Sequence, residues 1–190
     1  MTQVHSADCR KAPARWWRRS GRSALLLALM PLLACSPALD WRQVRPEGWH
    51  LQMALPCRPA TQTRVLALAG RPVELTLLAC SLEEHTYALA SADLIDPGQV
   101  GPALRALGQA ALANLQGRIE WEAPAQVKGM TPYAEARHWR LRGQRPDGQA
   151  VLAQVLVFAH GARVFQATLI GPQADDRLAQ ALFEPLEVLP

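Results

Sequence analysis

The chain has 190 residues, which suits one domain with an extension and is short for two domains of ordinary size. Its formal net charge of +4 is uneven: six basic residues and one acidic residue precede Cys35, whereas 14 basic and 15 acidic residues follow, a net charge of −1. A nucleic-acid-binding domain presents a basic face, so this distribution argues against nucleic acid as a partner of the folded part.

Residues 15–35 have the features of an export signal. Basic residues precede an apolar run at residues 24–33, about ten residues long, whereas a membrane-spanning helix needs roughly 18–20 apolar residues. We therefore expect residues 1–34 to be a signal peptide that is removed. Residues 1–14 make this leader unusually long, and a start codon assigned too early would account for them.

The leader ends in Leu32-Leu33-Ala34-Cys35, which resembles the lipobox of bacterial lipoproteins. Leu33 departs from that motif, where a small or β-branched residue is more usual. The resemblance implies cleavage after Ala34 by signal peptidase II and acylation of Cys35, so that two or three acyl chains hold the protein on a membrane. By analogy with enterobacterial sorting, Ser36 favours the outer membrane. An ordinary signal peptide with an incidental cysteine, or an uncleaved buried helix, is the alternative.

Residues 35–46 are expected to form a tether and residues 47–190 a single domain. Hydrophobic periodicity predicts four strands, a helix, four strands and a closing helix. The expected strands are 49–55, 64–68, 73–79, 86–92, 118–123, 133–141, 150–159 and 163–170; the helices run from 96 or 101 to 117 and from 174 to 183. The strand at 150–159 is apolar on both sides, so we expect it to be central. This order predicts an α+β domain with a mostly antiparallel β-sheet covered by two helices.

Several features accompany this order of elements: a strand ending in Ala54-Leu55-Pro56, Tyr87 before the first long helix, Arg163-Val164-Phe165-Gln166 in a late strand pair, and Phe183 in the terminal helix. Together they resemble the PsbP/DcrB-like group of α/β/α-sandwich domains, over residues 47 to about 188. The resemblance implies a three-layer fold. Members of this group are commonly lipoproteins or assembly factors that act by binding, so no catalytic residues are carried over.

Cys57 and Cys80 are the two cysteines of the expected domain. If Ala69-Gly70 forms a two-residue hairpin turn, Cys80 lies opposite residue 59, two positions from Cys57 and on the same side. Export exposes the pair to oxidising conditions, so we expect a disulfide, which would stabilise the fold by roughly 3 kcal/mol. A zinc site or a redox-active thiol is the alternative, although the sequence has no C-x-x-C motif.

The other polar residues of the domain form no reactive motif. Its histidines are scattered at His50, His85, His138 and His160. His85 follows Glu83 and Glu84 and could bind a metal ion. The simpler interpretation is that this segment is a polar turn between strands. The serines of the expected mature chain, Ser36, Ser81 and Ser91, lack a G-x-S-x-G motif.

Two charged groups allow a functional and a structural interpretation. Glu120 and Glu122 are expected on one face of a strand. They could act as the carboxylate pair of a glycosidase, or they could simply be solvated side chains on an exposed face. The basic cluster near one strand end either meets lipid headgroups or an acidic partner, or protects an exposed strand. Its members are Arg137, Arg140, Arg142 and Arg145.

The sequence therefore predicts a membrane-anchored, periplasm-facing envelope lipoprotein that acts as a non-catalytic binding or assembly module. We expect a protein partner in the envelope, and neither a cofactor nor a metal. A carrier or sensor of a small or lipidic ligand is the alternative, and an envelope hydrolase is a third hypothesis.

Overall fold

The computed structural model describes residues 40–190. The expected signal peptide, Cys35 and the first part of the expected tether lie outside the described residues.

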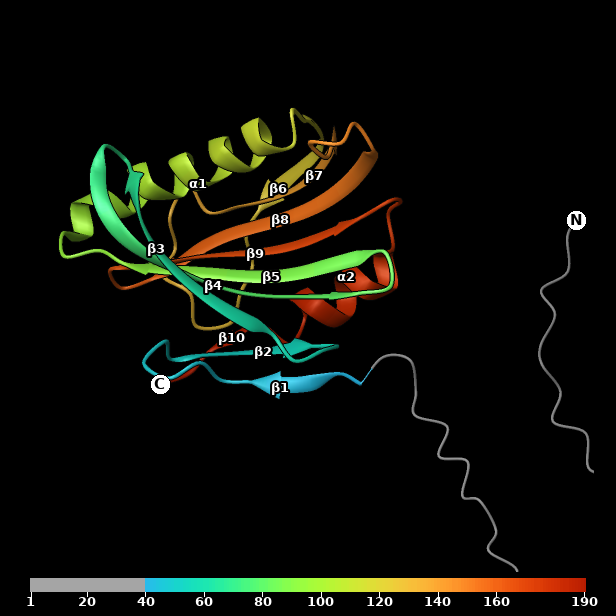
Figure 1. Ribbon diagram of the computed structural model, residues 1–190. Helices are drawn as coiled ribbons and strands as arrows, with labels where there is room; N and C mark the ends of the chain where they lie inside the picture. The colour runs from blue at the N-terminus through green and yellow to red at the C-terminus, as the bar shows by residue number, and fades with distance from the viewer. Residues whose placement is uncertain (1–39) are drawn as a thin grey trace, which may run out of the picture. The chain divides into compact units, whose positions relative to one another are not determined.

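Within residues 40–190, the largest element is a seven-stranded antiparallel sheet with the order β3-β4-β5-β9-β8-β7-β6 (Figure 1). Its strands are β3 (Ala60–Leu68), β4 (Arg71–Leu82), β5 (His85–Asp93), β6 (Arg118–Pro124), β7 (Arg137–Gln144), β8 (Ala150–His160) and β9 (Arg163–Gly171). The expected α+β class with a mostly antiparallel sheet is confirmed.

The two faces of this sheet are covered differently (Figure 1). Helix α1 (Val100–Asn114), which follows the short 3-10 helix η1 (Pro97–Gln99), packs across β8 and β9 on one face. The opposite face is covered by α2 (Asp176–Phe183) and a small sheet. That small sheet has the order β1-β2-β10 and is built from β1 (Arg42–Val44), β2 (Leu51–Leu55) and β10 (Glu187–Val188).

Strand β1 lies in the segment that the sequence assigned to the tether. Arg42 pairs with Leu55, and Val44 pairs with Met53. Just before β1, Trp41 packs edge-on against Tyr87, with 5.7 Å between the ring centroids. Burial of the Tyr87 phenol, helped by the charges of Asp175 and Glu83, raises its pKa to about 12. The end of the expected tether is therefore part of the packed fold.

Strand β7 is shorter than expected because residues 133–136 form a turn, in which the Ala136 amide donates to the Tyr133 carbonyl at 3.1 Å. Strand β3 is longer and begins at Ala60. The remaining expected strands and both helices are present, with shifts of a few residues at their ends.

Strand β8 is covered on both faces, as its apolar sequence predicted. Val155, Val157 and Phe158 are each 0 % exposed. Phe158 stacks on Phe165 of β9, with a centroid separation of 5.0 Å. Because β8 and β9 are inner strands with apolar side chains on both sides, they form the centre of the hydrophobic core.

Helix α1 and its C-cap residue bury the face that the sequence predicted: Val100, Leu104, Leu107, Ala111 and, at the C-cap, Leu115. Gly108 allows close packing on this face, because a Cβ atom there would lie 2.5 Å from the Trp139 ring of β7. In α2, Leu182 is fully buried, whereas Leu178 and Ala181, which were also expected to point inward, are half-buried.

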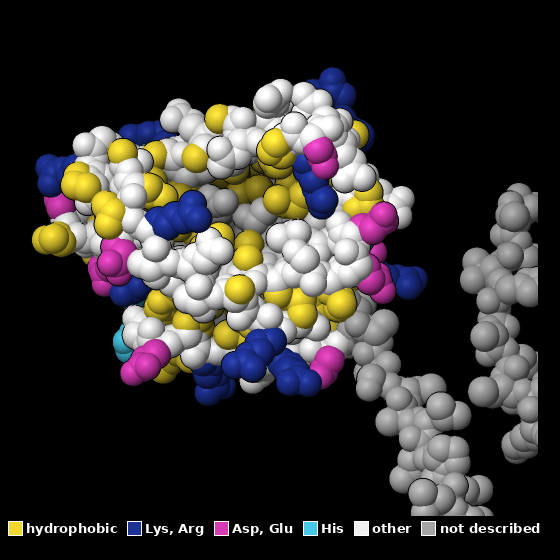
Figure 2. All heavy atoms as spheres, viewed as in Figure 1, with side chains coloured by type: hydrophobic (Ala, Val, Ile, Leu, Met, Phe, Trp, Pro, Cys, Tyr) yellow, Lys and Arg dark blue, Asp and Glu magenta, His cyan; other side chains and the backbone are white. Residues whose placement is uncertain are grey.

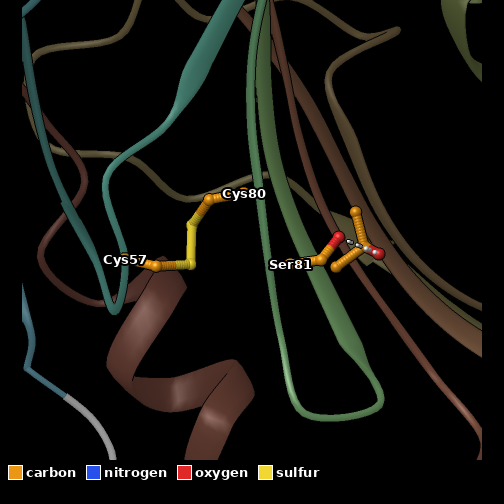
Figure 3. The surroundings of a disulfide bond; sticks show 4 residues. Cys57, Cys80 and Ser81 are labelled. Atoms are coloured by element: carbon orange, nitrogen blue, oxygen red, sulfur yellow. Dashed lines mark hydrogen bonds between the residues drawn. A yellow bond between two sulfur atoms is a disulfide. The ribbon is translucent and has the colours of Figure 1, made fainter.

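The expected disulfide between Cys57 and Cys80 is present, with 5.9 Å between the two Cα atoms (Figure 3). The expected hairpin turn is also present: Ala69 and Gly70 have φ of 50° and 78°, and Leu68 pairs with Arg71. The disulfide therefore fastens the segment after β2 to β4. Beside it, the Ser81 hydroxyl lies 3.1 Å from that of Thr86 on β5.

Val155 and Leu182 are both 0 % exposed, on opposite sides of the fold's centre. Replacing either residue with Ala should lower the free energy of unfolding by about 2–4 kcal/mol, because a cavity forms. Urea unfolding followed by circular dichroism measures this change. The control is Val65→Ala, at a side chain 69 % exposed, which should change it by less than about 0.5 kcal/mol. Equal effects at buried and exposed positions would contradict this core.

Candidate functional site: a pocket between two diverging strands

Strands β4 and β5 diverge at one end of the large sheet. Their pairing begins at Leu75 opposite Ala92, although β4 itself begins at Arg71. The residues from Arg71 to Glu74 remain paired with β3, whereas β5 remains paired with β9 as far as Asp93. The β3–β4 hairpin therefore leaves the plane of the sheet, and a fork opens between it and the segment that leads into α1.

A pocket of about 330 Å³ occupies this fork, and we call it the fork pocket. It is lined by Leu68, Arg71, Pro72, Val73, Glu74, Asp93, Leu94, Ile95, Asp96, Gln99 and Ala103. Leu68, Leu94 and Ala103 are buried, and the charged side chains are exposed. An apolar interior with a few polar groups is typical of small-molecule sites, and the volume lies at the lower end of their range.

The apolar surface continues beyond the pocket. Leu75 and Leu77 follow Val73 at two-residue intervals, so all three point to the side of the sheet on which α1 lies, and each is half-buried. Figure 2 shows hydrophobic side chains in a hollow between α1 and β5 on this face. Because α1 packs mainly over β8 and β9, it leaves this part of the sheet accessible.

Aliphatic side chains are also exposed beside the fork pocket. Ile95, on the loop after β5, is fully exposed, and Val65 and Leu66 of β3 are 69 % and 37 % exposed. We call these three residues the aliphatic edge. Leu66 lies on the same side of the hairpin as Val73, with which it pairs, whereas Val65 lies on the opposite side. In the described part of the chain, the other large exposed hydrophobic residues are Ile119 and Trp121, on β6 at the opposite end of the strand order.

Two of the four charged side chains that line the pocket have partners. Asp93 accepts a hydrogen bond from Arg163 Nη2 at 2.7 Å, and Asp96 accepts one from the Gly98 amide at 2.9 Å. Arg71 and Glu74 have no ion-pair partner among residues 40–190. Arg71 lies on the same side of β4 as Val73, whereas Glu74 lies on the opposite side, beside Thr76 and Arg163, so the two unpaired charges point to different faces of the strand.

The basic cluster, which lies on β7 except for Arg145 just after it, is largely neutralised. Arg137 pairs with Glu122 at 2.9 Å, and Arg142 pairs with Glu120. In the sequence, these arginines and the two glutamates are separate candidate sites. In the structure they form ion pairs between β6 and β7, so their charges neutralise each other.

The other two arginines of this cluster contact different elements. Arg140 pairs with Asp176 of α2 at 2.5 Å, and Arg145 reaches the Glu84 carbonyl at 3.5 Å. Strand β7 is also an inner strand, with β6 outside it, so its arginines do not protect a sheet edge.

The four histidines lie on separate elements. His50 and His160 are exposed, and His160 Nδ1 lies 3.0 Å from the Gly129 carbonyl. His85 begins β5, after the Glu83-Glu84 turn, and packs against Gly171. Within residues 40–190, no group of three or more histidine, cysteine or carboxylate side chains is placed to hold a metal ion.

His138 belongs to an aromatic cluster that sequence spacing did not reveal. Its ring lies between Trp121 of β6 and Phe183 of α2, with centroid distances of 5.3 Å and 4.8 Å. Burial lowers the pKa of His138, and the charge of Arg140 adds to this effect. The cluster fastens α2 to the β6 end of the sheet.

Comparison with protein-family models and with curated proteins finds no match to this chain. Among the described residues, no helix has both the length and the apolar character needed to cross a membrane.

The lowered pKa of His138 makes stability depend on pH. As the pH falls below 6.5, the unfolded chain takes up this proton before the folded chain does, so the free energy of unfolding decreases. His138→Phe should therefore lose less stability than the wild type between pH 7 and pH 5. Urea unfolding at the two pH values measures the difference. Trp121→Phe keeps the imidazole and should retain the wild-type dependence; an identical dependence in His138→Phe would contradict this assignment.

Proposed function

We propose that this chain is the precursor of a bacterial lipoprotein, and that its domain is a non-catalytic module that binds a protein partner in the cell envelope. The observation that carries the binding role is the aliphatic edge, formed by Val65, Leu66 and Ile95 beside the open fork pocket. Exposed apolar groups that gather at one place on a folded domain mark interaction surfaces.

Strand β3 supports contact with a protein. It is the end strand of the large sheet, and eight of its nine residues are exposed. Natural proteins commonly shorten or cover such edges, because unpaired main-chain groups bind other strands. A long exposed edge with aliphatic side chains suits a partner that adds an extended segment to the sheet.

The proposed localisation rests on the signal peptide and on Cys35, which would carry the acyl chains. The Cys57–Cys80 disulfide supports export, because disulfides persist in oxidising compartments. A periplasm-facing position on the outer membrane follows from Ser36 by the sorting analogy.

We also propose that the domain is an α/β/α sandwich of the PsbP/DcrB-like group. A large antiparallel sheet with α1 on one face, and α2 with the small sheet on the other, supports the PsbP/DcrB-like resemblance. Binding proteins and assembly factors are common in that group, which agrees with the role proposed for the aliphatic edge.

A carrier of a small or lipidic ligand is the second candidate. The fork pocket favours it, since a 330 Å³ apolar pocket with polar groups at its mouth is large enough for a small ligand. Native mass spectrometry of the gently extracted protein separates the two candidates, because a carrier retains a small molecule.

Lipidation can be tested directly. In a Gram-negative host, the wild-type chain should incorporate a labelled fatty acid, and Cys35→Ser should not, because the acylated thiol is absent. Gel autoradiography and mass spectrometry of the mature N-terminus measure this outcome. Cleavage at another position, without label in the wild type, would refute the proposed anchor.

If the domain acts by binding, substitutions in the aliphatic edge should impair function in cells more than substitutions of exposed polar side chains. In a strain that lacks the protein, Ile95→Asp should fail to restore function at normal abundance, because a charge disrupts an apolar contact. The matched exposed changes His50→Ala, Glu83→Ala, Glu84→Ala and His160→Ala should restore it.

A photoreactive amino acid at position 95 supplies the second measurement. It should form a discrete protein adduct in cells that is lost in Cys35→Ser, since the soluble form no longer stays at the membrane. A polar substitution that abolishes function without lowering abundance or melting temperature would instead indicate a reactive site.

A further inference from the structure

We propose that β3 pairs antiparallel with β3 of a second copy of this chain, so that two large sheets join into one across a two-fold axis at Thr63. The second copy is then the partner that adds an extended segment to the sheet. This inference deepens the proposed binding role and rests on it.

The two end strands of the large sheet differ in how well they are protected against pairing. Strand β6 has a register shift between Ile119 and Trp121, a proline at its end, and three charged residues among its seven. The nine residues of β3 pair with β4 without a register shift, include no proline, and carry one charge, at Arg64. Natural proteins shorten, bend or charge a sheet edge that has to remain free. Strand β3 lacks these devices, as expected of an edge that another strand covers.

Alternate residues of β3 turn their main-chain groups away from β4. Pro72 has no amide hydrogen, so its pair with Ala67 is not one of the hydrogen-bonded pairs of the ladder. The bonded pairs therefore begin at Leu68 opposite Arg71 and recur at every second residue. The residues between them direct their N–H and C=O groups to the open side: Thr61, Thr63, Val65 and Ala67. Among residues 40–190, these groups have no main-chain partner.

A two-fold axis at Thr63 places this open side against its own copy with matched side chains. Thr63 then faces Thr63 of the second copy and Thr61 faces Val65, so β-branched residues pair along one side of the joined sheet. On the other side, Gln62 faces Arg64 of the second copy. The Arg64 guanidinium donates to Gln62 of its own chain at 3.5 Å, and the same two groups meet across the axis.

Arg64 decides between the possible alignments. An axis at Arg64 would align all nine residues of β3, but it would place two guanidinium groups directly opposite each other, and facing like charges are destabilising. An axis at Val65 would place Arg64 against Leu66 of the second copy, which offers the guanidinium no acceptor. The axis at Thr63 avoids both contacts.

Pairing of β3 with itself also closes the assembly. Two copies joined in this way have the protected strand β6 at each end of the joined sheet, whereas pairing of β3 with β6 of the next copy would continue without end. The paired segment, residues 60–66, is much smaller than the roughly 20–30 residues that each side of a standard interface contributes. The pairing therefore depends on the raised effective concentration of chains held on one membrane.

The test is disulfide crosslinking of the full chain in the envelope of a Gram-negative host, followed by non-reducing gel electrophoresis. Thr63→Cys should form a dimer on mild oxidation, because a hydrogen-bonded antiparallel pair holds its Cα atoms about 5.5 Å apart, within the range of a disulfide. Val65→Cys should form about tenfold less dimer, because its two copies lie four positions out of register, roughly 13 Å along the strand. The wild type and Ile119→Cys, on β6, are the controls and should remain monomeric.

A charge exchange tests whether the partner strand is an identical one. In the Thr63→Cys background, Thr61→Lys with Val65→Lys places lysines opposite each other, whereas Thr61→Glu with Val65→Lys places a glutamate opposite each lysine. All three positions are exposed, so both variants should keep the core intact. The Glu–Lys variant should form about three- to tenfold more dimer than the Lys–Lys variant. Equal yields would show that β3 does not meet its own copy in this register.

Absence of the Thr63→Cys dimer at normal abundance, or equal dimer at all three cysteine positions, would overturn the proposal. If Thr63→Cys lowers abundance, co-expressed Gln62→Cys and Arg64→Cys chains provide the same test, because their mixture should form more dimer than either chain alone. An adduct of another protein at position 95 without the Thr63 crosslink would refute the self-pairing and leave the proposed binding role standing. Absence of both would refute both.

Discussion

Strands β8 and β9 are apolar on both sides, and the rest of the architecture depends on covering them. Phe158 and Phe165 stack on the face that meets β2 and α2, while Val155 and Val157 face α1. Because both faces must be removed from water, the cover lies over the middle of the sheet. The outer strands β3 and β4 then project beyond it, so the exposed hairpin and the open fork follow from where the core is buried.

The disulfide limits how far this projecting hairpin can move at its base. Cys57 lies just before β3 and Cys80 lies near the end of β4, so the bond joins the hairpin close to its connection with the body of the domain. The turn at Ala69 and Gly70, at the other end, has no comparable constraint in the described residues. The interaction surface proposed at the free end of this hairpin would combine a fixed base with local freedom to adapt to a partner.

Charge is distributed in opposite ways at the two ends of the sheet. At the β6–β7 end, Arg137 and Arg142 are neutralised by Glu122 and Glu120. Exposed ion pairs of this kind contribute little to stability, about 0–1 kcal/mol each, so their main effect is to remove free charge from that surface. At the fork, Arg71 and Glu74 remain unpaired within residues 40–190. The end that has free charges is also the end that has the accessible pocket, which makes it the better candidate for recognition.

The sequence by itself determined the elements whose signals are local. A segment that is apolar on both sides identified β8, and the 3.6-residue period identified the buried face of α1. Ala69-Gly70 marked a turn that set the register and brought Cys57 near Cys80. Strands β1 and β10 were missed because they are too short to show a period and exist only through pairing with β2. Only the tertiary structure decided the strand order, the ion pairs between β6 and β7, and the cluster around His138, because their members come from elements that are distant in sequence. The fork pocket belongs to this second group, since it depends on the residue at which β4 leaves β5, and main-chain twist together with the position of the core cover decides that point.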